Sequence, residues 1–539
     1  MNRPTTVFQR RIVIGAVICA ASFALVGARL VDVTLFIPRA AVENHRIVSE
    51  VVRGDLVDRN GELVARDLPA DDLYARPALF KNRALAAHQL AAASGADEPR
   101  LAQLFAGKHG AVLIARQLSV EDQAKVKRLA LRGLEYQPDS KRYYPDGRMA
   151  AQVVGVTDTD GKGVSGLELG LNPKLRGKRA VETSLDMRVQ FILDHEAAAS
   201  MAQFQARAAG GLVMDVKTGE ILALVSLPDF DPNARDFGGG DSQRNIIAQD
   251  VYELGSVFKI LTFSMAFEDH TLKSLDEMFK IGQGYQIGTH TIHEAERMPA
   301  MLAARDILAQ SSNIGTLQIA LRSGGAREHQ FLDNLGLMQP LKTILPETAR
   351  PLYPTTWGDI QTANVSFGQG MAVSPLAFVA AAATVVNGGR QITPTFIRQP
   401  PGADNRGRQM LKPETSEQMR DLLRYVVTNG TGRKADIPGY DVGGKTGSAQ
   451  VPGPHGYVPH ALRTSFFAAF PVHNPRYVVF VLMDQPHGTK ETGGFALAAY
   501  TAVPAAAHVI ARIAPLLGVP NVPPPAKIAT PKIDDGRSL

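Results

Sequence analysis

VFKILTFSMAF, from Val257 to Phe267, contains a single charged residue, Lys259. A run this apolar predicts a buried helix. Ser256 precedes Lys259 by three residues, so a helix would place its hydroxyl beside the amine. Burial and a nearby second cation both favour the neutral amine, which can accept the serine proton. The stretch therefore predicts a serine nucleophile with a lysine base, and the alternative is a snorkelling lysine behind an N-capping serine.

A second polar string, Ser311-Ser312-Asn313, closes the helix that we expect from Met301 to Gln310. Serine and asparagine favour helix ends, so the string alone is typical of a capped terminus. In a catalytic interpretation, Ser311 relays a proton between the nucleophile and the leaving amine. Asn313 would then hydrogen-bond a substrate amide.

The third string, Lys445-Thr446-Gly447-Ser448, has two interpretations. Together with Gly439 to Gly444 it satisfies G-x-x-x-x-G-K-T, the phosphate loop of nucleotide hydrolases. Such a loop must continue into a helix, but the following residues, up to Pro454, include several helix breakers. A short strand at the edge of a groove fits this composition better.

In that strand, Thr446 and Ser448 would point to the same side. Lys445 would supply positive charge to a cleft for a substrate carboxylate, and we assign Thr446, Gly447 and Ser448 to substrate binding. The backbone N–H groups of Ser448 and Ser256 would complete an oxyanion hole.

The three strings, in this order, match the S-x-x-K, S-x-N and K-T-G set of serine β-lactamases and penicillin-binding proteins. Further segments extend the match over nearly the whole chain, and the chain resembles the class B penicillin-binding proteins, most closely the division-specific FtsI group. The one departure is Leu254, where the family usually has proline. The segments that carry the resemblance are Arg53 to Gly61, Arg142 to Pro145, Ala150 to Gly155, Gly163 to Glu168, Trp357 to Asp359 and Ser366 to Gly370.

The resemblance implies a peptidoglycan D,D-transpeptidase that cross-links stem peptides through a serine acyl-enzyme and is inhibited by β-lactams. It implies catalytic roles for Ser256, Lys259, Ser311, Asn313 and Lys445, with no cofactor. Because no glycosyltransferase segment is recognisable, lipid II-derived glycan strands would come from a SEDS-type polymerase such as FtsW. An elongation enzyme, a D,D-carboxypeptidase or β-lactamase, and an inactive division scaffold remain as alternatives.

Composition agrees with an envelope protein. The formal net charge is +6 and the pI about 9.2, but no dense basic run or nucleic-acid motif is present, so we expect an anionic wall or membrane rather than nucleic acid. The single cysteine, Cys19, excludes an intramolecular disulfide. His290, His293 and Glu294 lack the order of a metal-binding motif, and we predict solvated loop histidines and no metal.

The chain divides into five predicted segments. An apolar run behind a basic start predicts an uncleaved membrane anchor with its N-terminus inside the cell and the remainder outside, at the septum by resemblance. The segments are a cytoplasmic tail (1–11), a transmembrane anchor (12–36), an elongated pedestal (37–180), a transpeptidase domain (181–515) and a disordered tail (516–539).

The transpeptidase segment has strand patterns at both of its ends and helices between them. We expect a helix from Met187 to Arg207, a hairpin from Leu212 to Val225, and strands at Thr464 to Phe470 and Tyr477 to Met483. This order predicts an α+β core in which one antiparallel sheet joins the first and last segments and is flanked by helices.

Overall fold

The computed structural model describes residues 17, 20–27, 53–107, 110–234, 240–454 and 456–522. The predicted cytoplasmic tail, 1–11, lies outside these residues, as does most of the predicted anchor, 12–36. Within the described ranges, no helix combines the length and apolar character that crossing a membrane requires. The described chain forms two compact units, one within residues 69–140 and one of residues 53–68 with 141 onward.

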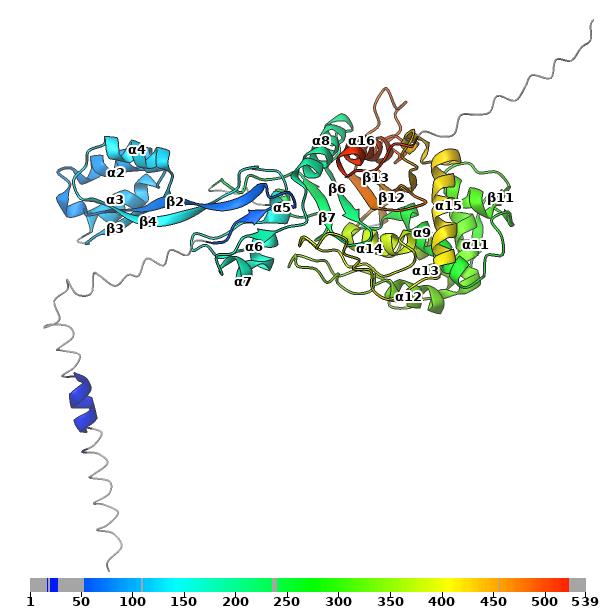
Figure 1. The fold of residues 1–539 in the computed structure, drawn as a ribbon, viewed down its shortest axis with the longest axis horizontal. Helices are drawn as coiled ribbons and strands as arrows, with labels where there is room; N and C mark the ends of the chain where they lie inside the picture. Colours follow the sequence, from blue (N-terminus) through cyan, green and yellow to red (C-terminus); the bar gives the residue numbers. More distant parts are fainter. Residues whose placement is uncertain are drawn as a thin grey trace, which may run out of the picture. The chain divides into compact units, whose positions relative to one another are not determined.

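The larger unit is built on a five-stranded antiparallel sheet of order β12-β13-β14-β6-β7. The predicted hairpin forms its N-terminal part, and the strands after the third motif pair with it through β14 and β6, which confirms the predicted α+β core (Figure 1). The strands are β6 (Ala208–Asp215), β7 (Ile221–Leu227), β12 (Gly443–Gly453), β13 (Gly456–Phe470) and β14 (Tyr477–Asp484).

Both faces of this sheet are covered by helices. The helices α8 (Met187–Gln203) and α16 (Ala502–Leu516) share one apolar core with the sheet. The helices α9 (Lys259–Glu268), α14 (Pro375–Val386) and α15 (Pro413–Asn429) share the other. Because α9 is buried along nearly its whole length, its one catalytic candidate, Lys259, is fixed by packing on all sides.

Three sequence expectations needed correction. The apolar run begins in a 3₁₀ turn, η5 (Gly255–Phe258), so Ser256 precedes the α-helix. The helix predicted from Met301 begins only at Ala304, as α10 (Ala304–Gln310), because Met301–Ala303 form strand β11 against β8 (Met278–Lys280).

The third correction concerns residues 516–522, the first part of the predicted disordered C-terminal tail, 516–539. Helix α16 ends at Leu516, Val519 is buried, and the backbone N–H of Val522 donates to Gly439. These contacts hold residues 516–522 against the larger unit, and residues 523–539 lie outside the described part of the chain.

In the described part of the smaller unit, three helices pack with β3 (Val112–Leu118) and with those parts of β2 (Leu63–Ala75) and β4 (Leu134–Tyr143) that fall within residues 69–140, and β4 pairs with β2. Leu90, Leu101, Phe105 and Val126 fill its separate apolar core. The helices are α2 (Arg83–Ser94), α3 (Glu98–Ala106) and α4 (Val120–Arg128).

Within the larger unit, three of the noncatalytic sequence segments meet in a buried ionic cluster. The Glu168 carboxylate accepts from Arg53 Nε at 2.5 Å and from Arg142 Nε at 2.7 Å. Arg142 also donates to Asp67 at 3.1 Å. Removing one partner would leave a buried charge uncompensated, at a cost of about 3–5 kcal/mol, so these segments contribute to the stability of the larger unit.

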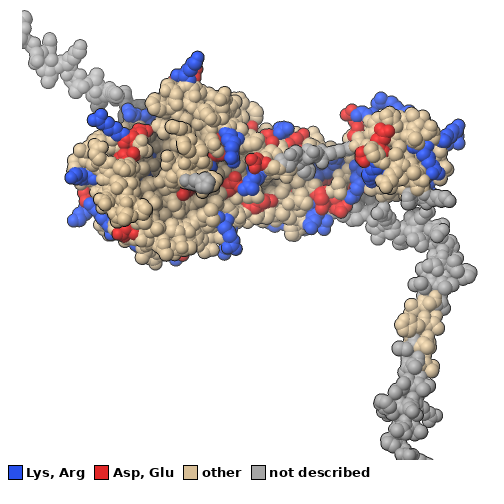
Figure 2. Space-filling view, turned by 180° about the vertical axis from the view of Figure 1, so that it is seen from behind, with Lys and Arg blue, Asp and Glu red and all other residues tan. Residues whose placement is uncertain are grey.

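Surface charge is mixed. On the face shown in Figure 2, acidic and basic side chains are interspersed, and broad areas carry neither. The formal net charge of +6 therefore does not gather into a continuous basic band on that face.

Candidate active site

A cleft of about 540 Å³ in the larger unit brings the three motifs together. Ser256, Ser311, Asn313, Thr446 and Ser448 line it. Lys259 and Lys445 are completely buried beneath these residues. Apolar side chains from three other segments complete the wall: Met298, Phe367, Phe495, Leu497 and Tyr500.

The turn that carries Ser256 is set by two close glycine contacts. Gly255 has φ +61, and its N–H donates to the Gly368 carbonyl at 3.1 Å. A Cβ on Gly368 would lie 2.1 Å from the Gly255 carbonyl oxygen, so only glycine fits there. Leu254, which replaces the family's usual proline, is buried, and these contacts hold the turn without the ring.

The K-T-G string lies in β12, the edge strand of the core sheet, and β12 continues past Thr446 to Gly453. A strand at this point excludes the phosphate-loop interpretation, which needs a helix. Gly447 is not among the residues that line the cleft. A Cβ there would lie 2.6 Å from the Leu254 carbonyl oxygen, so Gly447 allows β12 to pack against the nucleophile turn.

Lys259 has three partners, all in the Ser311-Ser312-Asn313 string. Its Nζ lies 2.5 Å from the Ser311 carbonyl oxygen, 2.8 Å from Asn313 Oδ1 and 3.2 Å from Ser311 Oγ. The Ser256 hydroxyl lines the cleft and has no hydrogen bond to any described residue. The placement of the Ser256 hydroxyl beside the Lys259 amine stays a prediction, and the two groups share no hydrogen bond in this structure.

Burial lowers the pKa of Lys259 to about 7, against a smaller opposing effect of the Glu294 carboxylate. A neutral amine has two N–H donors and one lone pair. The Ser311 carbonyl and Asn313 Oδ1 can only accept, so they take both donors. The lone pair is left for a hydroxyl, which is the arrangement a general base needs.

Ser311 links the two lysines. Its Oγ lies 3.2 Å from Lys259 Nζ and 2.9 Å from Lys445 Nζ. Burial, and then the neighbouring Lys259 charge, lower the pKa of Lys445. Ser311 has φ +66, a left-handed conformation that costs a serine about 1 kcal/mol or more. A strained residue between two buried amines indicates a functional constraint.

Glu294 is the residue that sequence reasoning missed. Its carboxylate accepts from the backbone N–H of Asn313 at 2.8 Å and of Ile314 at 3.0 Å, and from the Ser312 hydroxyl. It thereby caps α11 (Asn313–Ser323), whose first turn has no acidic residue of its own. No local signal links Glu294 to a helix that starts 19 residues later.

A hydroxyl pair closes the cleft beside the third motif. Thr431 Oγ1 lies 2.7 Å from Thr446 Oγ1, and both line the cleft. The histidines near Glu294 take no part: the His293 ring contacts the Gln283 carbonyl at 3.1 Å, and His290 is exposed. Among the described residues, no group of acidic, histidine or cysteine side chains has the arrangement of a metal site.

Known proteins share both parts of this chain. The model of the penicillin-binding protein transpeptidase domain matches residues 209–504, and that of the penicillin-binding protein dimerisation domain matches residues 48–186. A probable peptidoglycan D,D-transpeptidase FtsI of Caulobacter vibrioides is 38% identical, over 87% of this chain and 82% of its own. A probable D,D-transpeptidase PenA of Neisseria gonorrhoeae is 31% identical, over 82% of this chain and 81% of its own.

Solved structures agree. Penicillin-binding protein 3 of Mycobacterium tuberculosis, in complex with aztreonam, gives a TM-score of 0.68 at 26% identity, over 88% of this chain and 98% of its own. The matched transpeptidase region, 209–504, contains every residue that lines the cleft. The chain therefore belongs to the class B penicillin-binding proteins, among the FtsI-like peptidoglycan D,D-transpeptidases.

Proposed function

We propose that this protein cross-links peptidoglycan stem peptides with Ser256 as the nucleophile and Lys259 as its base. The observation that carries the proposal is the environment of Lys259: a buried amine whose two N–H donors are committed and whose pKa is about 7. Such an amine is neutral for a large fraction of the time at neutral pH. It can therefore take the Ser256 proton when a donor peptide fills the cleft.

In the acylation step, Ser256 Oγ bonds to the carbonyl carbon of the penultimate D-Ala, and its proton passes to Lys259. The C–N bond to the terminal D-Ala then breaks. The leaving nitrogen takes a proton from the Ser311 hydroxyl, which regains one from Lys259, 3.2 Å away. The cycle of Ser256, Lys259 and Ser311 thus returns Lys259 to its neutral form.

Deacylation runs this path in reverse with a new nucleophile. The amine of a neighbouring stem peptide attacks the acyl carbon, and its proton returns through Ser311 and Lys259 to Ser256 Oγ. Two stems become joined by an amide bond, and the enzyme is regenerated. Water in place of the amine would make the enzyme a carboxypeptidase.

Substrate placement follows from the edge position of β12. An edge strand has unpaired backbone groups, and a donor peptide that adds to it as a strand would pass Thr446 and Ser448. Its terminal carboxylate would favour the charged form of Lys445, which lies 2.9 Å from Ser311 Oγ. The Asn313 side-chain amide would donate to the stem peptide, and the N–H groups of Ser256 and Ser448 would hold the oxyanion.

The deciding experiment gives the purified full-length protein a synthetic donor stem ending in D-Ala-D-Ala, with and without an acceptor amine. We expect a cross-linked product by mass spectrometry that increases with acceptor concentration. Release of D-Ala with hydrolysed donor alone, at all acceptor concentrations, would instead establish a carboxypeptidase. No turnover and no acylation would establish an inactive scaffold.

For duty in the cell, we propose a single-pass inner-membrane protein that acts at the septum with an FtsW-like glycan polymerase. The support is the likeness to FtsI-named relatives and the apolar run at 12–36. Depletion should block septation while cells continue to lengthen. Cells that become round and still divide would assign the protein to elongation. A form starting near Ala40 should still be acylated by penicillin but fail to restore division.

A further inference from the structure

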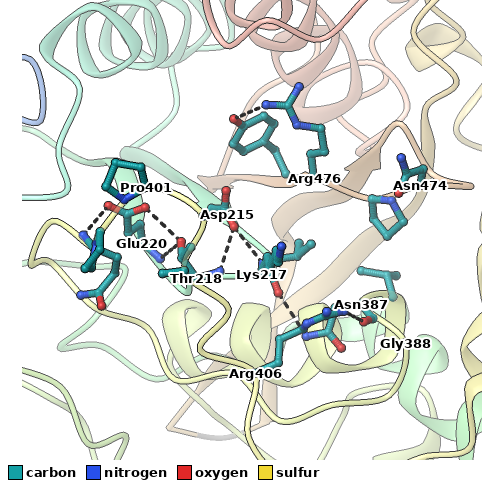
Figure 3. Close-up of a pocket in the computed structure, with 18 of the residues that line it drawn as sticks. Asp215, Lys217, Thr218, Glu220, Asn387, Gly388, Pro401, Arg406, Asn474 and Arg476 are labelled. Carbon is teal, nitrogen blue, oxygen red and sulfur yellow. Dashed lines mark hydrogen bonds between the residues drawn. The ribbon is translucent and has the colours of Figure 1, made fainter.

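A second hollow, of about 650 Å³, lies at one end of the core sheet, and no residue lines both it and the catalytic cleft. Its walls are the β6–β7 turn, residues 473–477 at the start of β14, the end of α14 and the loop of residues 398–406, with Arg59 and, from α15, Arg420. Figure 3 shows Lys217, Arg406 and Arg476 around it, each from a different one of these segments. Its volume lies in the range of small-molecule sites.

Basic residues dominate the lining. Six are arginine or lysine and two are acidic: Arg59, Lys217, Arg398, Arg406, Arg420 and Arg476 against Asp215 and Glu220.

The acidic residues are already engaged within the wall. Asp215 accepts the backbone N–H groups of Lys217 and Thr218, at 2.8 and 2.9 Å. Glu220 pairs with Arg59 at 3.8 Å and Arg398 at 3.4 Å. Asp404, just outside the lining, pairs with Arg406 at 2.6 Å.

Three cations remain without an ion pair among the described residues: Lys217, Arg420 and Arg476. Arg476 donates to the carbonyls of Gly518 and Leu517, at 2.8 and 3.1 Å. Such bonds to neutral acceptors fix the direction of the guanidinium but leave its charge uncompensated. Lys217 is exposed at the rim, and its amine makes no hydrogen bond or close ion pair with a described residue, although its charge acts on the carboxylate of Asp404 from a greater distance.

Arg420 also lacks an ion pair among the described residues, and its guanidinium is partly buried in the wall of the hollow. It donates to the Val386 carbonyl at 3.2 Å and to Ser416 Oγ at 2.9 Å, and its Nε is buried without a partner. Burial lowers its pKa, and the nearby carboxylates of Glu417 and Asp421 oppose this only in part. A partly desolvated guanidinium beside a polar hollow is stabilised by an anion in that hollow.

We propose that this hollow binds a phosphate-bearing anion. Planar guanidinium groups held in fixed directions match phosphate oxygens in pairs, and a lysine at the rim adds a mobile charge. The lining offers little apolar surface for an uncharged ligand, and a purely structural ion-pair network would supply a carboxylate for each cation.

The test is a calorimetric titration of the full-length protein with inorganic pyrophosphate at low ionic strength. We expect saturable binding that weakens as salt is added. Lys217→Glu should weaken it at least about tenfold, because attraction becomes repulsion at the rim. The matched control is Lys162→Glu, since Lys162 is also exposed and unpaired among the described residues but lies outside the hollow; it should bind as the wild type does.

Acylation by penicillin reports that each variant is folded, because Lys217 and Lys162 lie outside the cleft. No saturable binding at millimolar pyrophosphate would overturn the proposal, as would equal losses in the two variants. Two competitors separate the sources of phosphate. Displacement by glycerophosphoglycerol, the headgroup of phosphatidylglycerol, would assign the site to a lipid surface, and displacement only by inorganic phosphate would assign it to a soluble ligand.

Discussion

Gly368→Ala tests whether the nucleophile turn is held by the close packing of two backbone segments. The new Cβ would lie 2.1 Å from the Gly255 carbonyl oxygen, where real contacts are at least about 3 Å, so one segment must move by about 1 Å. Gly255 is joined to Ser256, and a 1 Å displacement of a catalytic group costs about a hundredfold in rate. We expect the second-order rate of acylation by a fluorescent penicillin to fall by about that factor.

The control is Gly370→Ala. Gly370 has φ +73, close to the +82 of Gly368, so alanine at either position introduces a similar backbone strain, of about 1–2 kcal/mol. Its Cβ, however, would lie 3.7 Å from its nearest neighbour, an ordinary contact. Gly370→Ala should lose stability in urea unfolding but acylate at nearly the wild-type rate. Equal acylation rates in the two variants would refute the packing argument.

Three further predictions concern buried charges. Glu294→Gln removes the carboxylate that favours the charged form of the Lys259 amine, so the pKa of Lys259 should fall. The rise of the acylation rate with pH, centred near pH 7 in the wild type, should then move to lower pH. An unchanged pH profile would show that Glu294 does not influence the charge of Lys259. Lys259→Arg should abolish acylation although its charge is kept, because a guanidinium does not deprotonate, and a near wild-type rate would remove Lys259 as the base. Burial raises the pKa of Glu328 from its ordinary 4.5 to about 8, so the wild type should lose about 3 kcal/mol of unfolding free energy between pH 4.5 and 7. Glu328→Gln, which keeps an acceptor for Trp357, should remove this loss, and parallel urea-unfolding pH profiles for the two proteins would contradict it.

The core and the motif residues could be predicted from the sequence because their signals are local. Each of these signals acts on the residues around it. They are the strand pattern of the hairpin near Leu212, the apolar run around Lys259 and the helix-breaking residues after Thr446. The bounds of the pedestal and transpeptidase segments at residue 180 stay a prediction, since contacts group residues 52–68 with those after 141.

What sequence could not supply are contacts made across the fold. Glu294 caps a helix from a distant loop. Position 368 must be glycine because a Cβ there would clash with the carbonyl oxygen of Gly255, more than a hundred residues earlier in the chain. Met301 looked helical because its propensity is helical, but pairing with β8 overrides that preference. The hydrogen bonds of the Lys259 amine to the Ser311 string could not be predicted from the sequence either, because the string lies about fifty residues further along the chain.

The most direct test of the central claim is the site of covalent penicillin attachment, read by mass spectrometry of the digested full-length protein. We expect one adduct, on Ser256, which is lost in Ser256→Ala and kept in Ser264→Ala, where the replaced hydroxyl donates within α9, to the Ile260 carbonyl. An adduct on Ser311 or Ser448, or labelling that survives in Ser256→Ala, would contradict it.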